Sequence, residues 1–120
     1  NKKDYLYAGS NEVDNVAWHA GNMAKSETKP VGLKSPNELG LYDMSGNVKE
    51  WCDSYFTYYP DEEQINPVKG SISNNTLKVL RSGSFQDSFY YCRISDRGNS
   101  SQNGKYEYAG FRIARTKVTF

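Results

Sequence analysis

No window of eleven residues in this chain keeps an apolar face at helical spacing without a glycine or proline inside it. The segment 13–18 is a weak and very short exception. Glycine, serine, asparagine and proline make up 38 of the 120 residues, so turn formers interrupt every longer pattern. The sequence therefore argues against a helical bundle and predicts a loop-rich domain.

Aromatic rings are expected to supply much of the buried surface. Leucine, isoleucine, valine and phenylalanine number only 22, whereas there are ten tyrosines. A disordered chain would combine low aliphatic content with few aromatics and a high net charge. The net charge here is +1, which also argues against a nucleic-acid partner. No apolar run approaches the length of a membrane span.

Short segments bounded by turn residues have the composition of β-strands. They are residues 47–52, 77–85, 91–97 and 110–115. Two polar segments, 61–76 and 98–107, are predicted to be surface loops.

The most informative segment is 36–53, PNELGLYDMSGNVKEWCD. Asp43 and Gly46 have the spacing of a tight turn, and Glu50 follows on a strand. Two carboxylates with main-chain carbonyls between them are the ligands of a hard cation such as Ca²⁺. From spacing alone, the alternative is that Asp43 caps the turn and Glu50 pairs with an arginine.

This segment closely resembles the N-x-x-G-L-Y-D-M-x-G-N-V-W-E-W signature of the formylglycine-generating enzyme family, also called the sulfatase-modifying factor family. Other segments resemble further motifs of the family in the right order: TKPVG at 28–32, KVLRSGSF at 78–85, RISDR at 93–97 and GFRIAR at 110–115. The upstream R-L-P-T-E-A-E-W-E motif is absent. Residues 1–120 are therefore expected to form a single domain, the C-terminal portion of that family's domain.

The resemblance implies an α+β, loop-rich fold of the C-type-lectin-like class, with small antiparallel sheets and little helix. It also implies a calcium ion. Its ligands correspond here to the side chains of Asp43 and Glu50 and the carbonyls of Gly46 and Val48.

Family enzymes oxidise a cysteine of a client sulfatase with O₂ and a copper ion held by two thiolates. Counting forward from Arg81, the two cysteine positions fall on Asp87 and Cys92. Counting backward from Arg97, Cys92 falls on a non-catalytic position. One thiolate is missing under either count, so neither copper binding nor catalysis is expected.

The two cysteines, Cys52 and Cys92, leave two alternatives open. They could form a disulfide or contact each other, or each could be a small buried hydrophobe, as free cysteine often is. Neither alternative makes them catalytic.

Two tyrosine-bearing segments, QDSFYY at 86–91 and GKYEY at 104–108, have a composition typical of binding loops. In variable proteins of diversity-generating retroelements, which share the implied fold, residues vary in this region. Of these rings, Phe89 or Tyr91 is predicted to be core. The alternative is that Phe89, Tyr90 and Tyr91 are all core, because the chain has few aliphatic residues to fill one. The predicted ligand-binding residues are Asp87, Ser88, Tyr90, Tyr106 and Tyr108.

Trp51 is expected to be buried, and Arg81, Arg97 and Arg112 are expected to be structural and mostly buried. The predicted function is a non-catalytic binding or interaction module for a protein or small-molecule ligand. An extracytoplasmic bacterial location, periplasmic or cell-surface, is expected. The alternatives are a copper-dependent oxidase that makes formylglycine, a ligand-binding variable protein, and a purely structural domain.

Overall fold

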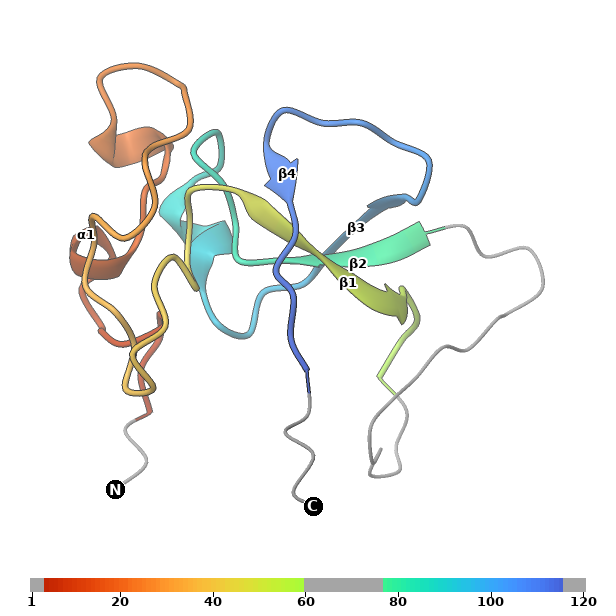
Figure 1. The fold of residues 1–120 in the computed structure, drawn as a ribbon, viewed down its shortest axis with the longest axis horizontal. Helices are drawn as coiled ribbons and strands as arrows, with labels where there is room; N and C mark the ends of the chain where they lie inside the picture. Colours follow the sequence, from red (N-terminus) through yellow and green to blue (C-terminus); the bar gives the residue numbers. More distant parts are fainter. Residues whose placement is uncertain (1–3, 60–76, 116–120) are drawn as a thin grey trace.

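The computed structural model describes residues 4–59 and 77–115 of the chain. A four-stranded sheet lies beside several short helical turns (Figure 1). The helical turns are α1 (Val13–Val16), η1 (Ala20–Asn22) and η2 (Phe89–Cys92), and the strands are β1 (Lys49–Tyr55), β2 (Leu77–Arg81), β3 (Gly98–Ser101) and β4 (Ala109–Gly110). The predicted loop-rich α+β fold with little helix is confirmed.

The sheet is mixed, with the strand order β3-β2-β1-β4. β2 pairs antiparallel with both β1 and β3, as the resemblance implied. β4 runs parallel to β1, with Lys49 opposite Ala109. The chain crosses from β3 to the other edge of the sheet, and on the way Tyr106 packs against Trp51 with 6.3 Å between ring centroids.

Two of the strand predictions were in the right place, since β1 and β2 lie where 47–52 and 77–85 were predicted. The prediction for 91–97 was wrong. Arg81 donates to the carbonyls of Ile94 and Asp96, and Ser88 caps η2 by accepting from the amide of Tyr90. The two carbonyls that Arg81 binds are groups that a strand over 91–97 could have used for its ladder, and the Ser88 cap begins a helical turn just before them.

Other boundaries also differ from the predictions. The segment 98–107, predicted to be a loop, contains β3, and within 110–115 only Gly110 belongs to a strand. Polar residues can form β3 because its backbone pairs with β2 from Leu77 to Leu80. The loop predicted at 61–76 lies outside the described residues.

The core is small and less aromatic than the composition suggested. Tyr7, Val16, Ala17 and Cys92 form one buried cluster, and Val79, Leu80 and Phe85 are the other buried apolar residues among those described. Trp51, predicted to be buried, is only half-buried. Its ring is covered by Tyr106, from the segment that connects β3 to β4, and not by a second layer of helices or strands.

The turn before β1, residues 43–48, contacts three other segments of the chain, and we call it the signature turn. Gly46 has φ +75°, and a Cβ placed there would lie 2.4 Å from the carbonyl oxygen of Trp18. Next to it, Asn47 is 4% exposed and exchanges two side-chain hydrogen bonds with the backbone of Lys29. The backbone of Asn47 also donates to Trp18 and accepts from Phe85. These contacts hold the signature turn in place, and they thereby fix where β1 begins and which way its side chains point.

Candidate functional site

Lys49 stands at the centre of a cluster on one face of β1. Its Nζ lies 3.0 Å from Oδ1 of Asp87, 5.2 Å from the ring centroid of Tyr108 and 5.9 Å from that of Tyr91. Side chains alternate along a strand, so Lys49 and Trp51 share this face while Glu50 points to the other. We call the surface formed by Lys49, Asp87, Tyr91, Tyr106 and Tyr108 the tyrosine face.

Contacts between the two tyrosine-bearing loops hold this face together. The side-chain amide of Gln86 donates to the Glu107 carboxylate at 2.7 Å, and this hydrogen bond joins one loop to the other. Tyr106 and Tyr108 stack with 5.1 Å between centroids, and the Tyr106 hydroxyl accepts from Ser100 of β3. Rings fixed in this way lose little further freedom when they contact a ligand.

The structure brings only three of the five predicted ligand-binding residues together: Asp87, Tyr106 and Tyr108. Ser88 serves instead as the N-cap of η2. Tyr90 is 58% exposed, but it stacks on Phe89 rather than on the other tyrosines.

Two members of the tyrosine face were missed from the sequence. The prediction that Tyr91 or Phe89 is core was wrong, because the two residues are 50% and 42% exposed. η2 buries Cys92 instead and leaves the preceding rings at the surface. Lys49 could have been noticed, since it stands where the quoted signature has tryptophan.

Asp87 forms a compact polar cluster beneath the rings. Its carboxylate binds Lys49 through Oδ1 and the Ser84 hydroxyl through Oδ2. The Lys49 and Asp87 side chains are 23% and 18% exposed, so the pair is largely removed from water. By the forward count, this hard carboxylate stands where the related enzymes place their first thiolate.

The two cysteines are free thiols in different environments, and the disulfide alternative is not realised. Cys92 is fully buried in the core cluster, and desolvation raises its pKa to about 12, with the Asp87 charge contributing. Cys52 on β1 is half-buried, and burial raises its pKa as well. A thiol with a raised pKa stays protonated near neutral pH, and the thiolate is the form that binds metal or reacts.

We therefore expect both thiols to react slowly with a disulfide reagent at pH 8 in the native protein. Cys92 should be the slower of the two because it is fully buried, and unfolding in guanidinium should make both react within the mixing time. Peptide mapping after timed labelling measures each site. Rapid native labelling of Cys92 would contradict its burial and its raised pKa.

The signature turn carries a second charged group, built on Glu50 and Arg112. Arg112 donates to both carboxylate oxygens of Glu50, at 2.7 and 3.1 Å, and to the carbonyls of Tyr42 and Asp43. The hydrogen bond to Glu50 raises the pKa of Arg112. Glu50 thus pairs with an arginine, as one sequence alternative proposed.

The three framework arginines all bind main-chain carbonyls, as a structural role requires: Arg81 binds Ile94 and Asp96, Arg97 binds Thr57, and Arg112 binds Tyr42 and Asp43. The arginine side chains are less buried than predicted. Arg81 and Arg97 are half-buried and Arg112 is exposed.

Asp43 provides the test of whether the turn suits a hard cation. Its Oδ2 accepts from the Gly32 amide at 2.8 Å, whereas its buried Oδ1 has no hydrogen-bond partner among the residues described. A buried carboxylate oxygen without a donor is costly unless a cation or water satisfies it. One atom of the expected donor set, Oδ1 of Asp43, is therefore suited to a cation, whereas the Glu50 carboxylate is bound by Arg112.

Within the described ranges, no helix is long and apolar enough to cross a membrane. Nor do three or more histidine, cysteine or acidic side chains gather there in a way that could hold a metal ion. A cation at the signature turn would therefore depend on main-chain carbonyls as well as on its two carboxylates.

Comparison with known proteins identifies one family model and relatives that carry several different names. Residues 1–117 match the profile of the sulfatase-modifying factor enzyme 1-like domain. Chaperone protein LppX of Paenibacillus barcinonensis is 32% identical over 96% of this chain and 43% of that protein. The formylglycine-generating enzyme of Streptomyces coelicolor is 34% identical over 72% of this chain and 29% of the enzyme.

Solved structures give the same picture. Treponema denticola variable protein 1 superposes with a TM-score of 0.79 and 32% identity, over 91% of this chain and 40% of that one. PvdO from Pseudomonas aeruginosa gives 0.64 and 27%, over 81% and 38%. The chain thus spans less than half the length of each of these relatives.

Proposed function

Because this chain belongs to the family of sulfatase-modifying factor enzyme 1-like domains, we propose that it is a non-catalytic binding module whose contact surface is the tyrosine face. The observation that carries this proposal is the ion pair between Lys49 and Asp87. A soft Cu(I) ion needs thiolates, and a carboxylate neutralised by an ammonium group is a poor substitute. We expect copper to bind weakly, if at all.

The tyrosine face has the chemistry of a contact surface. Tyrosine offers a large amphipathic area at a low entropy cost, and stacked rings keep that area in place. Lys49 and Asp87 are already paired, so a ligand meets mainly rings, hydroxyls and amides. Such a surface suits an uncharged segment of a protein or a small aromatic molecule.

The likeness to a variable protein supports a related alternative. In this alternative, the two tyrosine-bearing loops vary in sequence between copies of the protein, while the sheet and the signature turn stay constant. The other alternative, a copper-dependent oxidase that makes formylglycine, is supported by the similarity to family enzymes and opposed by the missing thiolate.

We also propose that the signature turn holds one Ca²⁺ ion. Asp43 and Glu50 would supply their side chains, and Gly46 and Val48 would supply their carbonyls. The unpartnered Oδ1 of Asp43 supports this proposal. When bound, the ion would supply positive charge that stabilises the turn. The start of β1, which follows the turn directly, would be held in place with it.

The proposed setting is a bacterial protein outside the cytoplasm, in the periplasm or at the cell surface. Bacterial sources of several relatives support the first part of this proposal. Fractionation of the source cells with an antibody to this chain tests the second part.

To test the binding role, peptides can be selected from a display library against the chain, since such peptides converge on the surfaces best suited to contact. We expect the triple substitution Tyr91→Ser, Tyr106→Ser and Tyr108→Ser to weaken their binding at least tenfold while the circular dichroism spectrum stays unchanged. Tyr58→Ser is the matched control, because Tyr58 is 97% exposed and lies outside the face. Unfolding of the triple variant would show that the rings are structural, and unchanged affinity would show that binding occurs elsewhere.

A further inference from the structure

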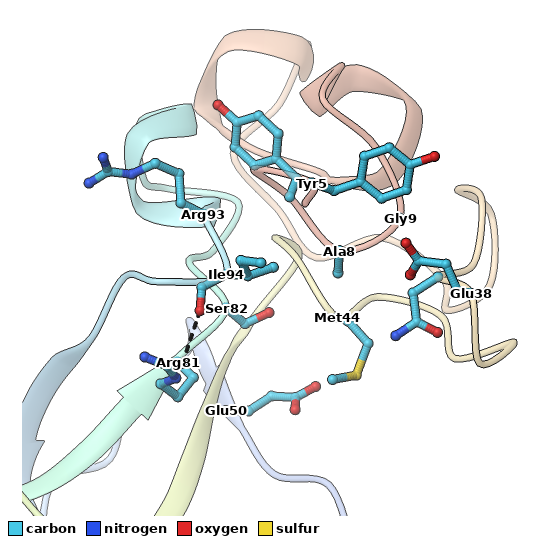
Figure 2. Close-up of a pocket in the computed structure, with 12 residues that line it drawn as sticks. Tyr5, Ala8, Gly9, Glu38, Met44, Glu50, Arg81, Ser82, Arg93 and Ile94 are labelled. Carbon is cyan, nitrogen blue, oxygen red and sulfur yellow. Dashed lines mark hydrogen bonds between the residues drawn. The ribbon is translucent and has the colours of Figure 1, made fainter. Parts of the chain in front are cut away.

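A pocket of about 280 Å³ is lined by Glu50 of β1 (Figure 2). Because side chains alternate along a strand, Glu50 lies on the face of β1 opposite to Lys49 and the tyrosine face. Ala8, Met44 and Ile94 supply apolar surface, and Glu38, Glu50 and Ser82 are among its polar lining residues. The pocket shares Glu50 with the proposed calcium site, but none of its lining residues belongs to the tyrosine face.

Ser82 is the unusual residue of this pocket. It has φ +88° although it is not a glycine, and the related family motif has glycine at this position. It is 8% exposed, and its Oγ has no hydrogen-bond partner within the described part of the chain. Figure 2 shows the hydroxyl pointing into the space between Ile94, Met44 and Glu50.

Both features of Ser82 cost stability. A side chain at positive φ is strained, and a buried hydroxyl without a partner loses the hydrogen bonds that water would give it. Glycine would avoid both costs. The serine therefore keeps a hydrogen-bonding group in the lining of the pocket, where a bound molecule could satisfy it.

The charges around the pocket balance and are mostly committed to partners. The lining residues include two glutamates, Glu38 and Glu50, and two arginines, Arg81 and Arg93. Each guanidinium donates to main-chain carbonyls, and Glu50 is bound by Arg112. A ligand with a net charge would therefore find little unpaired opposite charge, so the pocket favours a neutral molecule.

The size and the mixed lining narrow the ligand further. The pocket has room for about nine water molecules at ~30 Å³ each, which is the scale of one sugar ring. We propose that it binds a neutral polyhydroxylated ligand of that size. Ser82 and Glu38 would bond to its hydroxyl groups, while Met44 and Ile94 would pack against its C–H surface.

The test uses methyl glycosides of glucose, galactose, mannose and N-acetylglucosamine, with binding followed by NMR chemical-shift changes. We expect at least one of them to bind in the millimolar range or tighter and to shift the amide signals of Ala8, Ser82 and Ile94. Ser82→Ala should weaken this binding roughly tenfold. Ser82→Gly should weaken it similarly and yet raise the melting temperature by a few degrees, because glycine relieves the strained φ.

Two further variants locate the effect. Ala8→Leu should weaken binding by filling the pocket, and Tyr108→Ser on the tyrosine face should leave it unchanged. The proposal is overturned if none of the four glycosides binds, if both Ser82 variants bind as well as the original chain, or if the shifts map to the tyrosine face. Because the site is separate from that face, these results leave the proposed binding role untouched.

Discussion

Replacing Gly46 with alanine should lower the free energy of unfolding by about 2–5 kcal/mol. Gly46 has φ +75°, a conformation that costs an ordinary residue about 1–2 kcal/mol. The new Cβ would also lie 2.4 Å from the carbonyl oxygen of Trp18 and 2.7 Å from its nitrogen. Backbone atoms cannot move aside easily, so overpacking adds about 1–3 kcal/mol. The combined loss is a large part of a typical domain's stability of about 5–15 kcal/mol.

Gly40 provides a matched control for this substitution. It has the same φ of +75°, but a Cβ there would meet nothing within 4 Å. Gly40→Ala should therefore show only the conformational cost, and the difference between the two variants measures the close approach at Trp18. Urea unfolding followed by tryptophan fluorescence gives both values. Equal losses would mean that the turn does not pack against Trp18 as described.

Calcium should raise the free energy of unfolding by an amount that grows with its concentration. An ion that binds only the folded chain adds about 2.7 kcal/mol at a hundred times its dissociation constant. The chain should therefore melt several degrees higher in millimolar Ca²⁺ than in a chelator. Glu50→Gln should remove most of this calcium-dependent shift, because it takes away one of the two carboxylates.

The calcium-dependent shift, not the melting temperature alone, is the informative quantity. Glu50→Gln also weakens the bond to Arg112, so it lowers stability with or without the ion. Glu12→Gln is a suitable control, because Glu12 is exposed and lies outside the signature turn. A melting curve that a chelator leaves unmoved in the original chain would rule out the calcium site.

The sequence predicted the parts of the fold that depend on local chemistry. Gly46 and the period-two pattern after it located the turn and β1, because positive φ and alternation leave direct marks in a sequence. The segment 91–97 has the composition of a strand, but composition does not reveal that the guanidinium of Arg81 binds its carbonyls. A contact between residues far apart in the chain decided that segment.

The candidate site could be predicted only in part, because some of its features have local sequence patterns and others depend on contacts between distant residues. Tyrosine-rich loops indicated a binding surface, and the family resemblance drew attention to Asp87. The partner of Asp87 is Lys49, which lies 38 residues earlier, and neither residue by itself suggests an ion pair. The prediction of Phe89 or Tyr91 as core rested on the small number of aliphatic residues, whereas η2 buries Cys92. Which side of η2 is buried depends on how this short helix is rotated, and four residues do not determine that.

We propose that this chain binds a ligand and does not oxidise a client cysteine. The most direct measurement incubates the purified protein with Cu(I), O₂ and a peptide containing Cys-x-Pro-x-Arg, with the Streptomyces coelicolor formylglycine-generating enzyme as the positive control. Mass spectrometry follows the replacement of the cysteine thiol by an aldehyde. With Asp87 paired to Lys49 and the Cys92 thiol buried, the account predicts that the peptide keeps its sulfur while the control peptide is converted. Copper-dependent formation of the aldehyde by this chain would contradict the account.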